Sequence, residues 1–496
     1  MNIRRHTTAI IILCLCGICA FWIIANARYT ASHDGDSLVP ILSSLYYWTF
    51  FYWQQNRFGM LIPLLTKPIS DPWLNLQIQN WLNVFCACTI FFLAAKVIGA
   101  KSYLSAGLLS LTVFLATTHD HFQFSAFSTQ QPYPVSLALI FAAIALWDIQ
   151  KKKWQILSFC LSLLGAWVNT SAPIIALLII IFRYRSPFVH EDNPTSSRLV
   201  KFFHNFNIVA DIRLIIVLTI SLFAGYLAVR VSPWNNTRLS SVSLTLWPNA
   251  IVQLSRNLIN EYGPHTIIVG FVILLILLSL ITLATTNLKY RHVLHITLSL
   301  FITALVFYLF ISSLRWLKSN MYASRYAIPS VILILVASAI QITDTFLLWF
   351  NSNKNKIFTI IFTIGLLFCL AYRFGPPSMS TARTQFDNTF GKNSANIINV
   401  GCTHLIGNYY EVWPAVLHSN MLRYEHSNNS RIWGITARSV VNESLWRNTP
   451  FKDWTICQLG DDSEREKYIN AYHLPKMREV KRVENLILLA WDDDIQ

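Results

Sequence analysis

Charged residues are scarce in this chain. Lys, Arg, Asp and Glu make up 13% of its 496 residues, whereas hydrophobic residues make up 54%. Apolar runs repeatedly reach the roughly 17 to 25 residues that a helix needs to cross a bilayer. The composition therefore excludes an ordinary soluble domain over most of the chain. It predicts a polytopic membrane protein that lies in a lipid bilayer.

Acidic residues are scarcer than basic ones, with 24 Asp and Glu against 39 Lys and Arg and a net charge of +15. In a soluble protein this excess suggests nucleic acid as a partner. Here much of it lies in loops between apolar runs, and no nucleic-acid-binding motif is present. We expect no nucleic acid partner.

The apolar runs predict about eleven transmembrane helices. They cover roughly residues 7–27, 79–98, 102–118, 132–149, 154–168, 172–183, 212–231, 265–286, 292–312, 327–350 and 356–374. Lys and Arg concentrate in cytoplasmic loops, and this arrangement leaves sixteen on one side and ten on the other before the tail. The bias places the amino terminus in the cytoplasm and the C-terminal tail outside. It also favours a hairpin over one interrupted helix for residues 154–182.

The first span has an alternative interpretation. Arg4-Arg5, an apolar stretch and Ala25-Asn26-Ala27 also fit a cleaved signal peptide. Both interpretations place the segment after residue 27 outside.

Gly375-Pro376-Pro377-Ser378 marks a linker, which divides the chain into a membrane domain, residues 1–374, and an external soluble domain, residues 375–496. Four strand-like runs, 395–400, 431–436, 454–459 and 486–491, alternate with helix-compatible segments and predict a small α/β domain. Seven of the nine cysteines lie in apolar spans. Cys402 and Cys457 lie in the tail, either as a disulfide or as two free thiols.

Ionisable side chains are nearly missing from the centres of the predicted spans, where a transporter would carry an ion path or proton relay. Acidic and histidine residues gather at the external ends instead: His33, Asp34, Asp36, Asp71, His119, Asp120, His121, Glu261 and His265. The external face is therefore the predicted working surface. A lipid-linked oligosaccharide flippase or other transporter and a non-catalytic scaffold are the alternatives.

An acidic motif, His33-Asp34-Gly35-Asp36-Ser37, directly follows the first span. Asp34 or Asp36 is placed to take a proton from an incoming hydroxyl, or to hold a divalent cation such as Mg²⁺ or Mn²⁺. The alternative is that the motif only caps the next helix. Residues 37–55 have one polar and one aromatic face and predict a helix lying in the membrane interface.

Two further groups are candidates for the site. His119-Asp120-His121 has the spacing for a second acidic or metal site, or forms a solvated loop. Arg57, Arg315, Lys318 and Arg325 are external cations suited to binding a phosphate, while interfacial snorkelling explains each one singly.

These motifs together resemble the GT-C superfamily of integral-membrane glycosyltransferases, in the manner of dolichyl-phosphate-mannose mannosyltransferases and aminoarabinose transferases. The matching elements are the acidic motif and aromatic segment after the first span, Asn56-Arg57-Phe58-Gly59, the hairpin 164–173, and Arg325-Tyr326-x-x-Pro329. The family's common Asp-Glu pair is absent, and Asn169 and Thr170 stand where its hairpin turn often has Lys.

The resemblance implies an inverting, Asp-dependent transfer of a sugar from a polyprenyl-phosphate donor to a glycan or glycolipid acceptor of the cell envelope. Asp36 or Asp34 would be catalytic, and Arg325, Arg57, Lys318 and Arg315 would hold the donor phosphate. It also implies a bacterial inner membrane location with a periplasmic tail, where Asn408 to Pro414 would either help to bind the acceptor or pack onto the membrane domain.

Overall fold

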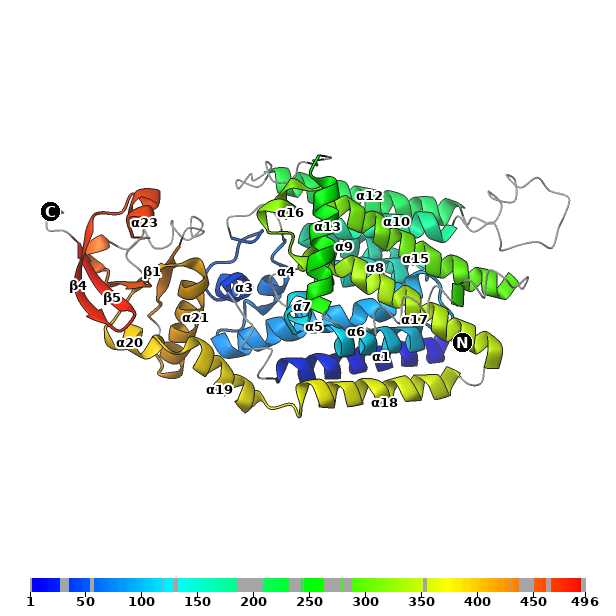
Figure 1. The fold of residues 1–496 in the computed structure, drawn as a ribbon, viewed down its shortest axis with the longest axis horizontal. Helices are drawn as coiled ribbons and strands as arrows, with labels where there is room; N and C mark the ends of the chain where they lie inside the picture. Colours follow the sequence, from blue (N-terminus) through cyan, green and yellow to red (C-terminus); the bar gives the residue numbers. More distant parts are fainter. Residues whose placement is uncertain are drawn as a thin grey trace. The chain divides into compact units, whose positions relative to one another are not determined.

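The computed structural model describes residues 2–26, 35–53, 58–118, 120–127, 133–184, 208–231, 242–243, 245–262, 278–279, 288–350, 355–428, 430–436, 450–460 and 465–491. The fold is mostly helical with one small sheet (Figure 1). The chain forms two compact units, one of residues 1–20, 83–127 and 131–375, and one of residues 21–82, 128–130 and 376–496. The division at residue 374/375 that the linker suggests remains a prediction, because the second unit also contains residues 21–82.

Helices make up the described part of the first unit. After the start of α1 (Asn2–Ile24) and the end of α5 (Pro72–Val97), they are α6 (Tyr103–Thr117), α7 (Asp120–Phe127), α8 (Tyr133–Trp147), α9 (Lys152–Val168), α10 (Ser171–Tyr184), α12 (Ile208–Val231), α13 (Trp247–Tyr262), α15 (Leu288–Ser312), α16 (Arg315–Ser319), the 3₁₀ turn η2 (Ser324–Ala327), α17 (Ile328–Phe350) and α18 (Asn355–Phe374). In Figure 1, α8, α9, α12, α15 and α17 run side by side, and α13 crosses them.

Ten of the eleven predicted spans coincide with helices, and residues 265–286 lie almost wholly outside the described residues. Among the described residues, six helical segments are long and apolar enough to cross a membrane, and Tyr103–Thr117, Tyr133–Trp147 and Ser171–Phe182 are shorter apolar helices. The chain is thus a multi-pass membrane protein. The count of eleven remains a prediction.

The predicted hairpin is confirmed as two helices, α9 and α10, that meet at Asn169 and Thr170. A Cβ atom added to Gly165 of α9 would lie 2.8 Å from Ile140 of α8, so glycine permits this close packing. The Ser136 hydroxyl donates to the Gly165 carbonyl at 2.7 Å. The Asn169 side chain accepts from the Ser171 amide at 2.9 Å and begins α10.

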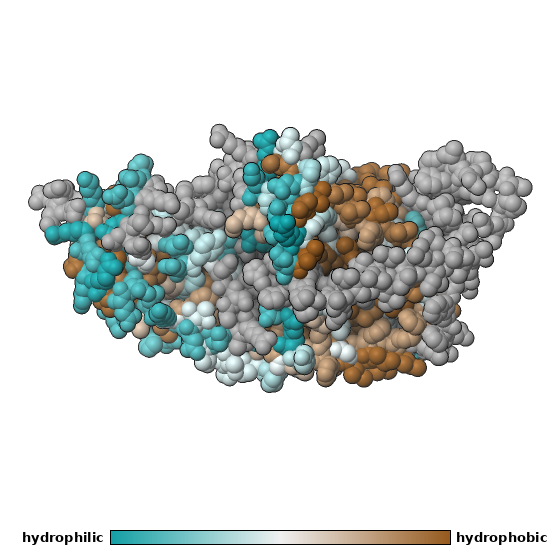
Figure 2. Space-filling view, in the orientation of Figure 1, coloured by the Kyte–Doolittle hydropathy of each residue, from teal (hydrophilic) through white to brown (hydrophobic). Residues whose placement is uncertain are grey.

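Apolar side chains cover exposed faces of the first unit. On α12, Ile212, Ile216, Ile220 and Phe223 are each about half exposed and recur at helical spacing. Figure 2 shows hydrophobic surface over the region of α12 and of α18, whereas the sheet of the second unit is mostly hydrophilic. Such apolar surface is unfavourable in water and is stable against lipid chains.

A five-stranded sheet forms the centre of the tail, in the order β2-β1-β3-β5-β4. The strands are β1 (His404–Gly407), β2 (Trp433–Ile435), β3 (Ile456–Leu459), β4 (Met477–Val483) and β5 (Leu486–Trp491). β1 pairs in parallel with β2 and β3, and β5 is antiparallel to β3 and β4. The tail helices are α19 (Met379–Phe390), α20 (Ser394–Asn399), α21 (Tyr409–Glu425), α23 (Arg465–Tyr472) and the turn η4 (Phe451–Asp453). The predicted small α/β arrangement is present.

One of the four predicted strands is wrong. Residues 395–400 lie mainly in α20, and the first strand begins only at His404. Short apolar runs do not distinguish a helix from a strand by periodicity alone. Gly401, whose φ is +76°, lies in the turn between α20 and β1. β4 was not predicted, because its exposed alternating charges resemble a polar loop.

The predicted interfacial helix over residues 37–55 is also corrected. The helix is α3 (Gly35–Leu45), and every residue of it except Leu45 is buried. It packs on α21 and on the short helix α4 (Leu61–Thr66). Residues 46–53 are irregular, with an isolated bridge between Phe51 and Gly59. The apolar face of α3 is therefore part of a protein core, and of the aromatic residues that follow it Phe51 and Tyr52 are buried whereas Trp48 is half-buried.

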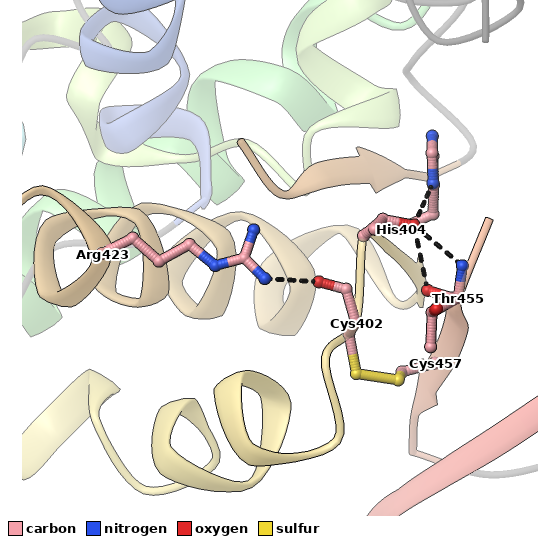
Figure 3. Close-up of a disulfide and its surroundings, with 6 residues drawn as sticks. Cys402, His404, Arg423, Thr455 and Cys457 are labelled. Carbon is pink, nitrogen blue, oxygen red and sulfur yellow. Dashed lines mark hydrogen bonds between the residues drawn. A yellow bond between two sulfur atoms is a disulfide. The ribbon is translucent and has the colours of Figure 1, made fainter. Parts of the chain in front are cut away.

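Cys402 and Cys457 form a disulfide with their Cα atoms 5.8 Å apart (Figure 3). It joins the segment before β1 to the neighbouring strand β3. Of the two states that the sequence left open, the structure has the bonded one.

Candidate active site

Asp36 lies in the first turn of α3 and is 9% exposed. A carboxylate at this end of a helix is favoured by the partial positive charge of the helix amino terminus. His33, Asp34 and Arg57 fall outside the described residues. Of the two candidate bases, the structure therefore describes the surroundings of Asp36.

A proline inside α3 changes the hydrogen bonding of Asp36. Pro40 has no amide hydrogen, so the Asp36 carbonyl, four residues earlier, lacks its usual helical donor. The Tyr52 hydroxyl donates to that carbonyl at 2.9 Å. The same hydroxyl lies 2.9 Å from the hydroxyl of Tyr409, the first residue of α21. Asp36 is thus connected through two tyrosines to the tail.

The amino terminus of α3 packs closely on α21. A Cβ atom added to Gly35 would lie 2.8 Å from the Tyr409 carbonyl oxygen, which no ordinary side chain tolerates. On the other side, the Asn75 side chain donates to the Ser44 hydroxyl at 3.0 Å, and Gln79 to the Pro40 carbonyl at 3.4 Å. α3 is fixed along its length, which keeps the Asp36 backbone in one position.

Arg315, Lys318 and Arg325 belong to the first unit. Arg315 and Lys318 lie three residues apart on α16 and are both exposed. Arg325 is half-buried, and its guanidinium lies 5.3 Å from the ring centre of buried Tyr326. Two of the three predicted phosphate ligands in this loop are thus accessible, and the third is braced against an aromatic ring.

The loop that carries these cations is fixed by α13. Asn257 donates to the carbonyl oxygens of Met321 at 3.1 Å and Tyr322 at 2.9 Å. Met321 and Tyr322 both have positive φ values, 53° and 54°, which side chains other than glycine rarely adopt. Pro329 stands in the first turn of α17, where its missing amide hydrogen costs nothing. A strained turn, held by the hydrogen bonds from Asn257, therefore lies between α16 and Arg325.

Asp120 begins α7, and its carboxylate accepts a hydrogen bond of 2.7 Å from the Arg373 guanidinium, which also donates to the Thr118 carbonyl at 2.6 Å. His119 and the side chain of His121 lie outside the described residues. No group of three or more potential metal ligands occurs among the described residues. The metal roles of this motif and of Asp36 therefore remain predictions.

The tail segment Asn408 to Pro414 begins α21 and packs inside the second unit. The Trp413 ring lies 5.6 Å from that of Trp53, between ring centres, and Trp413 is 1% exposed. The segment therefore packs against residues 46–53 of the same unit, and packing onto the membrane domain remains a prediction. A role in acceptor binding remains a prediction.

The sequence interpretation missed three residues that support the site: Tyr52, Tyr409 and Asn257. A signal for the first was present, because Pro40 inside a predicted helix leaves the Asp36 carbonyl in need of a donor. No sequence signal identifies which of the 19 tyrosines supplies it. Tyr409 and Asn257 lie far along the chain from the groups they contact, and only the fold brings them together.

Comparison with known proteins gives limited information. No family model and no curated protein matches the chain. The structure aligns with ArnT from Cupriavidus metallidurans bound to undecaprenyl phosphate, at 11% identity over 98% of this chain and 99% of that one, with a TM-score of 0.49. It also aligns with the Archaeoglobus fulgidus oligosaccharyltransferase, at 10% identity over 95% and 69%, with a TM-score of 0.32. Both TM-scores are below 0.5, too low for a conclusion on fold or function. The proposed function therefore depends on the residues of this chain.

Proposed function

We propose that the chain is an integral-membrane glycosyltransferase of the GT-C type. It moves a sugar from a polyprenyl-phosphate donor to a glycan or glycolipid acceptor of the cell envelope at the external face of a bacterial inner membrane. The observation that carries the proposal is Asp36, a carboxylate in the first turn of a buried helix whose backbone is fixed by Tyr52. A hydroxyl acceptor needs such a positioned base.

The chemistry is a single inverting displacement. The acceptor oxygen forms a bond to the anomeric carbon, the bond from that carbon to the phosphate oxygen breaks, and the acceptor proton passes to the carboxylate of Asp36 or Asp34. The polyprenyl phosphate leaves with its charge, which Arg325, Lys318, Arg315 and Arg57 stabilise. A divalent cation, Mg²⁺ or Mn²⁺, is a candidate cofactor at the same carboxylates.

The distribution of polar groups supports an enzyme over a transporter or a scaffold. Among the described candidates, Asp36, Arg315 and Lys318 lie outside the candidate spans, and Arg325 is the second residue of the span Ser324–Leu348 rather than near its centre. A transporter would be expected to place ionisable groups or interrupted helices at the membrane midplane.

The test is glycan and glycolipid analysis of a deletion strain complemented with wild type, Asp34→Asn or Asp36→Asn. We expect at least one Asn variant to lack one sugar on the acceptor at unchanged protein level, because an amide cannot accept the proton. Asp453→Asn, an exposed aspartate in the tail, is the matched control and should restore the sugar. Complete glycosylation in both variants would exclude the catalytic assignment.

A further inference from the structure

A buried arginine in the tail has no counter-ion among the residues that the structure describes. Arg423 of α21 is 7% exposed. Its Nη2 donates to the Cys402 carbonyl at 2.9 Å (Figure 3), while its Nε and Nη1 are buried without a hydrogen-bond partner. Burial lowers the pKa of Arg423, and the opposing influence comes from Tyr46 rather than from a carboxylate. Two donors and one positive charge are left unsatisfied.

Further donors surround this guanidinium. Ser419 stands one helical turn before Arg423 on the same face of α21, is fully buried, and its hydroxyl also lacks a partner. Arg431 is exposed, and its guanidinium lies 5.1 Å from the ring centre of Tyr46. Burial raises the pKa of Tyr46, whereas the charge of Arg431, a hydrogen bond with Asn420 and the charge of Arg423 lower it.

This arrangement is costly without a ligand. Burying a charge with no partner is strongly unfavourable, and each buried donor without an acceptor adds to that cost. A neutral ligand would satisfy the donors but leave two positive charges. A phosphate group has both the negative charge and the several acceptor oxygens that arginine side chains bind well.

We propose that Arg423, Ser419, Tyr46 and Arg431 form an oxyanion site that binds a phosphate group, either the free ion or a monoester on a sugar. All four residues belong to the second unit, whereas the cations predicted to bind the donor phosphate in the described loop belong to the first. The site therefore needs no part of the proposed transfer reaction and stands or falls independently of it.

The experiment measures binding of radiolabelled inorganic phosphate to the full-length protein in a phosphate-free detergent by equilibrium dialysis, with chloride at matched ionic strength. We expect saturable binding that weakens about 10- to 100-fold in Arg423→Met, as for loss of charge-assisted hydrogen bonds. Arg431→Gln and Tyr46→Phe should weaken it by smaller factors. Lys476→Gln, which replaces an exposed cation of the same unit, is the control and should bind as wild type does.

A stability measurement distinguishes a ligand site from a purely structural arginine. Without phosphate, Arg423→Met should melt no lower than wild type, because a buried unpaired charge is removed. An Arg423→Met protein that binds phosphate with unchanged affinity, or a wild type that binds none, would overturn the proposal. If Arg423→Met does not fold, unchanged binding in the Tyr46→Phe/Arg431→Gln double variant would do so. Competition by glucose 6-phosphate identifies a monoester site, and its failure identifies a site for the free ion.

Discussion

His404 shows how burial sets the behaviour of a single residue. It begins β1, is 2% exposed, and its ring is stacked on that of Trp454 with centres 3.8 Å apart. Its Nδ1 lies 2.9 Å from the Thr403 hydroxyl, and its Nε2 has no hydrogen-bond partner within the described part of the chain. Burial lowers the pKa of His404 to about 3, so the imidazole is neutral at physiological pH.

This residue predicts a loss of stability in mild acid. In the unfolded chain histidine has a pKa near 6.5, so below about pH 6.5 the unfolded state binds a proton that the folded state does not bind until about pH 3. The free energy of unfolding should fall by about 2 kcal/mol between pH 6.5 and 5. Thermal melting of the full-length protein across this range measures it. His404→Gln should flatten the dependence, and an unchanged slope would contradict the assignment.

At this scale the sequence predicted residue types better than partners. The acidic motif was identified because it directly follows the first span, and the cysteine pair because only Cys402 and Cys457 lie outside the predicted spans. The bond between Tyr52 and Asp36 was not predictable, because it joins a hydroxyl to a backbone group and no charge or spacing marks it.

Helix α3 illustrates what an element adds to its residues. Its proline leaves the Asp36 carbonyl without a helical donor, and Tyr52 from the following irregular segment supplies one. The proline therefore ties the orientation of α3 to the tyrosines of the second unit.

This arrangement predicts a rescue between two substitutions. Tyr52→Phe removes a buried hydrogen bond of about 1 kcal/mol and should lower the rate of sugar transfer about fivefold. Pro40→Ala restores an amide hydrogen to the Asp36 carbonyl, so the double variant should recover much of that loss. The readout is the amount of glycosylated acceptor in complemented cells at matched protein levels. Equal loss in the single and double variants would show that Tyr52 acts elsewhere.

Helices were predictable in long, continuously apolar segments. Helices and strands were less predictable in short segments or in segments that mix apolar and polar residues. Long apolar runs specify helices such as α12 and α17 because length alone excludes a strand. The run at 395–400 was too short for this distinction and formed a helix. The apolar residues within 37–45 were correctly identified, but the helix predicted over 37–55 ends at Leu45, and sequence cannot show that α21 covers it.

At the scale of the whole molecule, the tail carries a disulfide, a bond that is rare in reducing compartments. This agrees with the predicted orientation, in which the amino terminus is cytoplasmic and the tail external. The sequence separation of 55 residues makes the bond a strong constraint on the unfolded chain.

Loss of this bond should destabilise the second unit. The Cys402→Ser/Cys457→Ser double variant should lose about 4 kcal/mol of unfolding free energy by loop-closure entropy. The measurement is the melting midpoint of the full-length protein. In intact cells, a thiol reagent that cannot cross membranes should label these cysteines only after reduction by an equally impermeant reductant. Labelling without reduction would contradict both the bond and its role.

We propose that this protein consumes a polyprenyl-phosphate sugar. The most direct measurement is paired mass spectrometry of lipid-linked sugars and acceptor glycans from cells carrying wild type, Asp34→Asn or Asp36→Asn. We expect the sugar that is missing from the acceptor to accumulate on polyprenyl phosphate in at least one of the two Asn variants. Acceptors that keep all their sugars, with no accumulated donor in either variant, would contradict it.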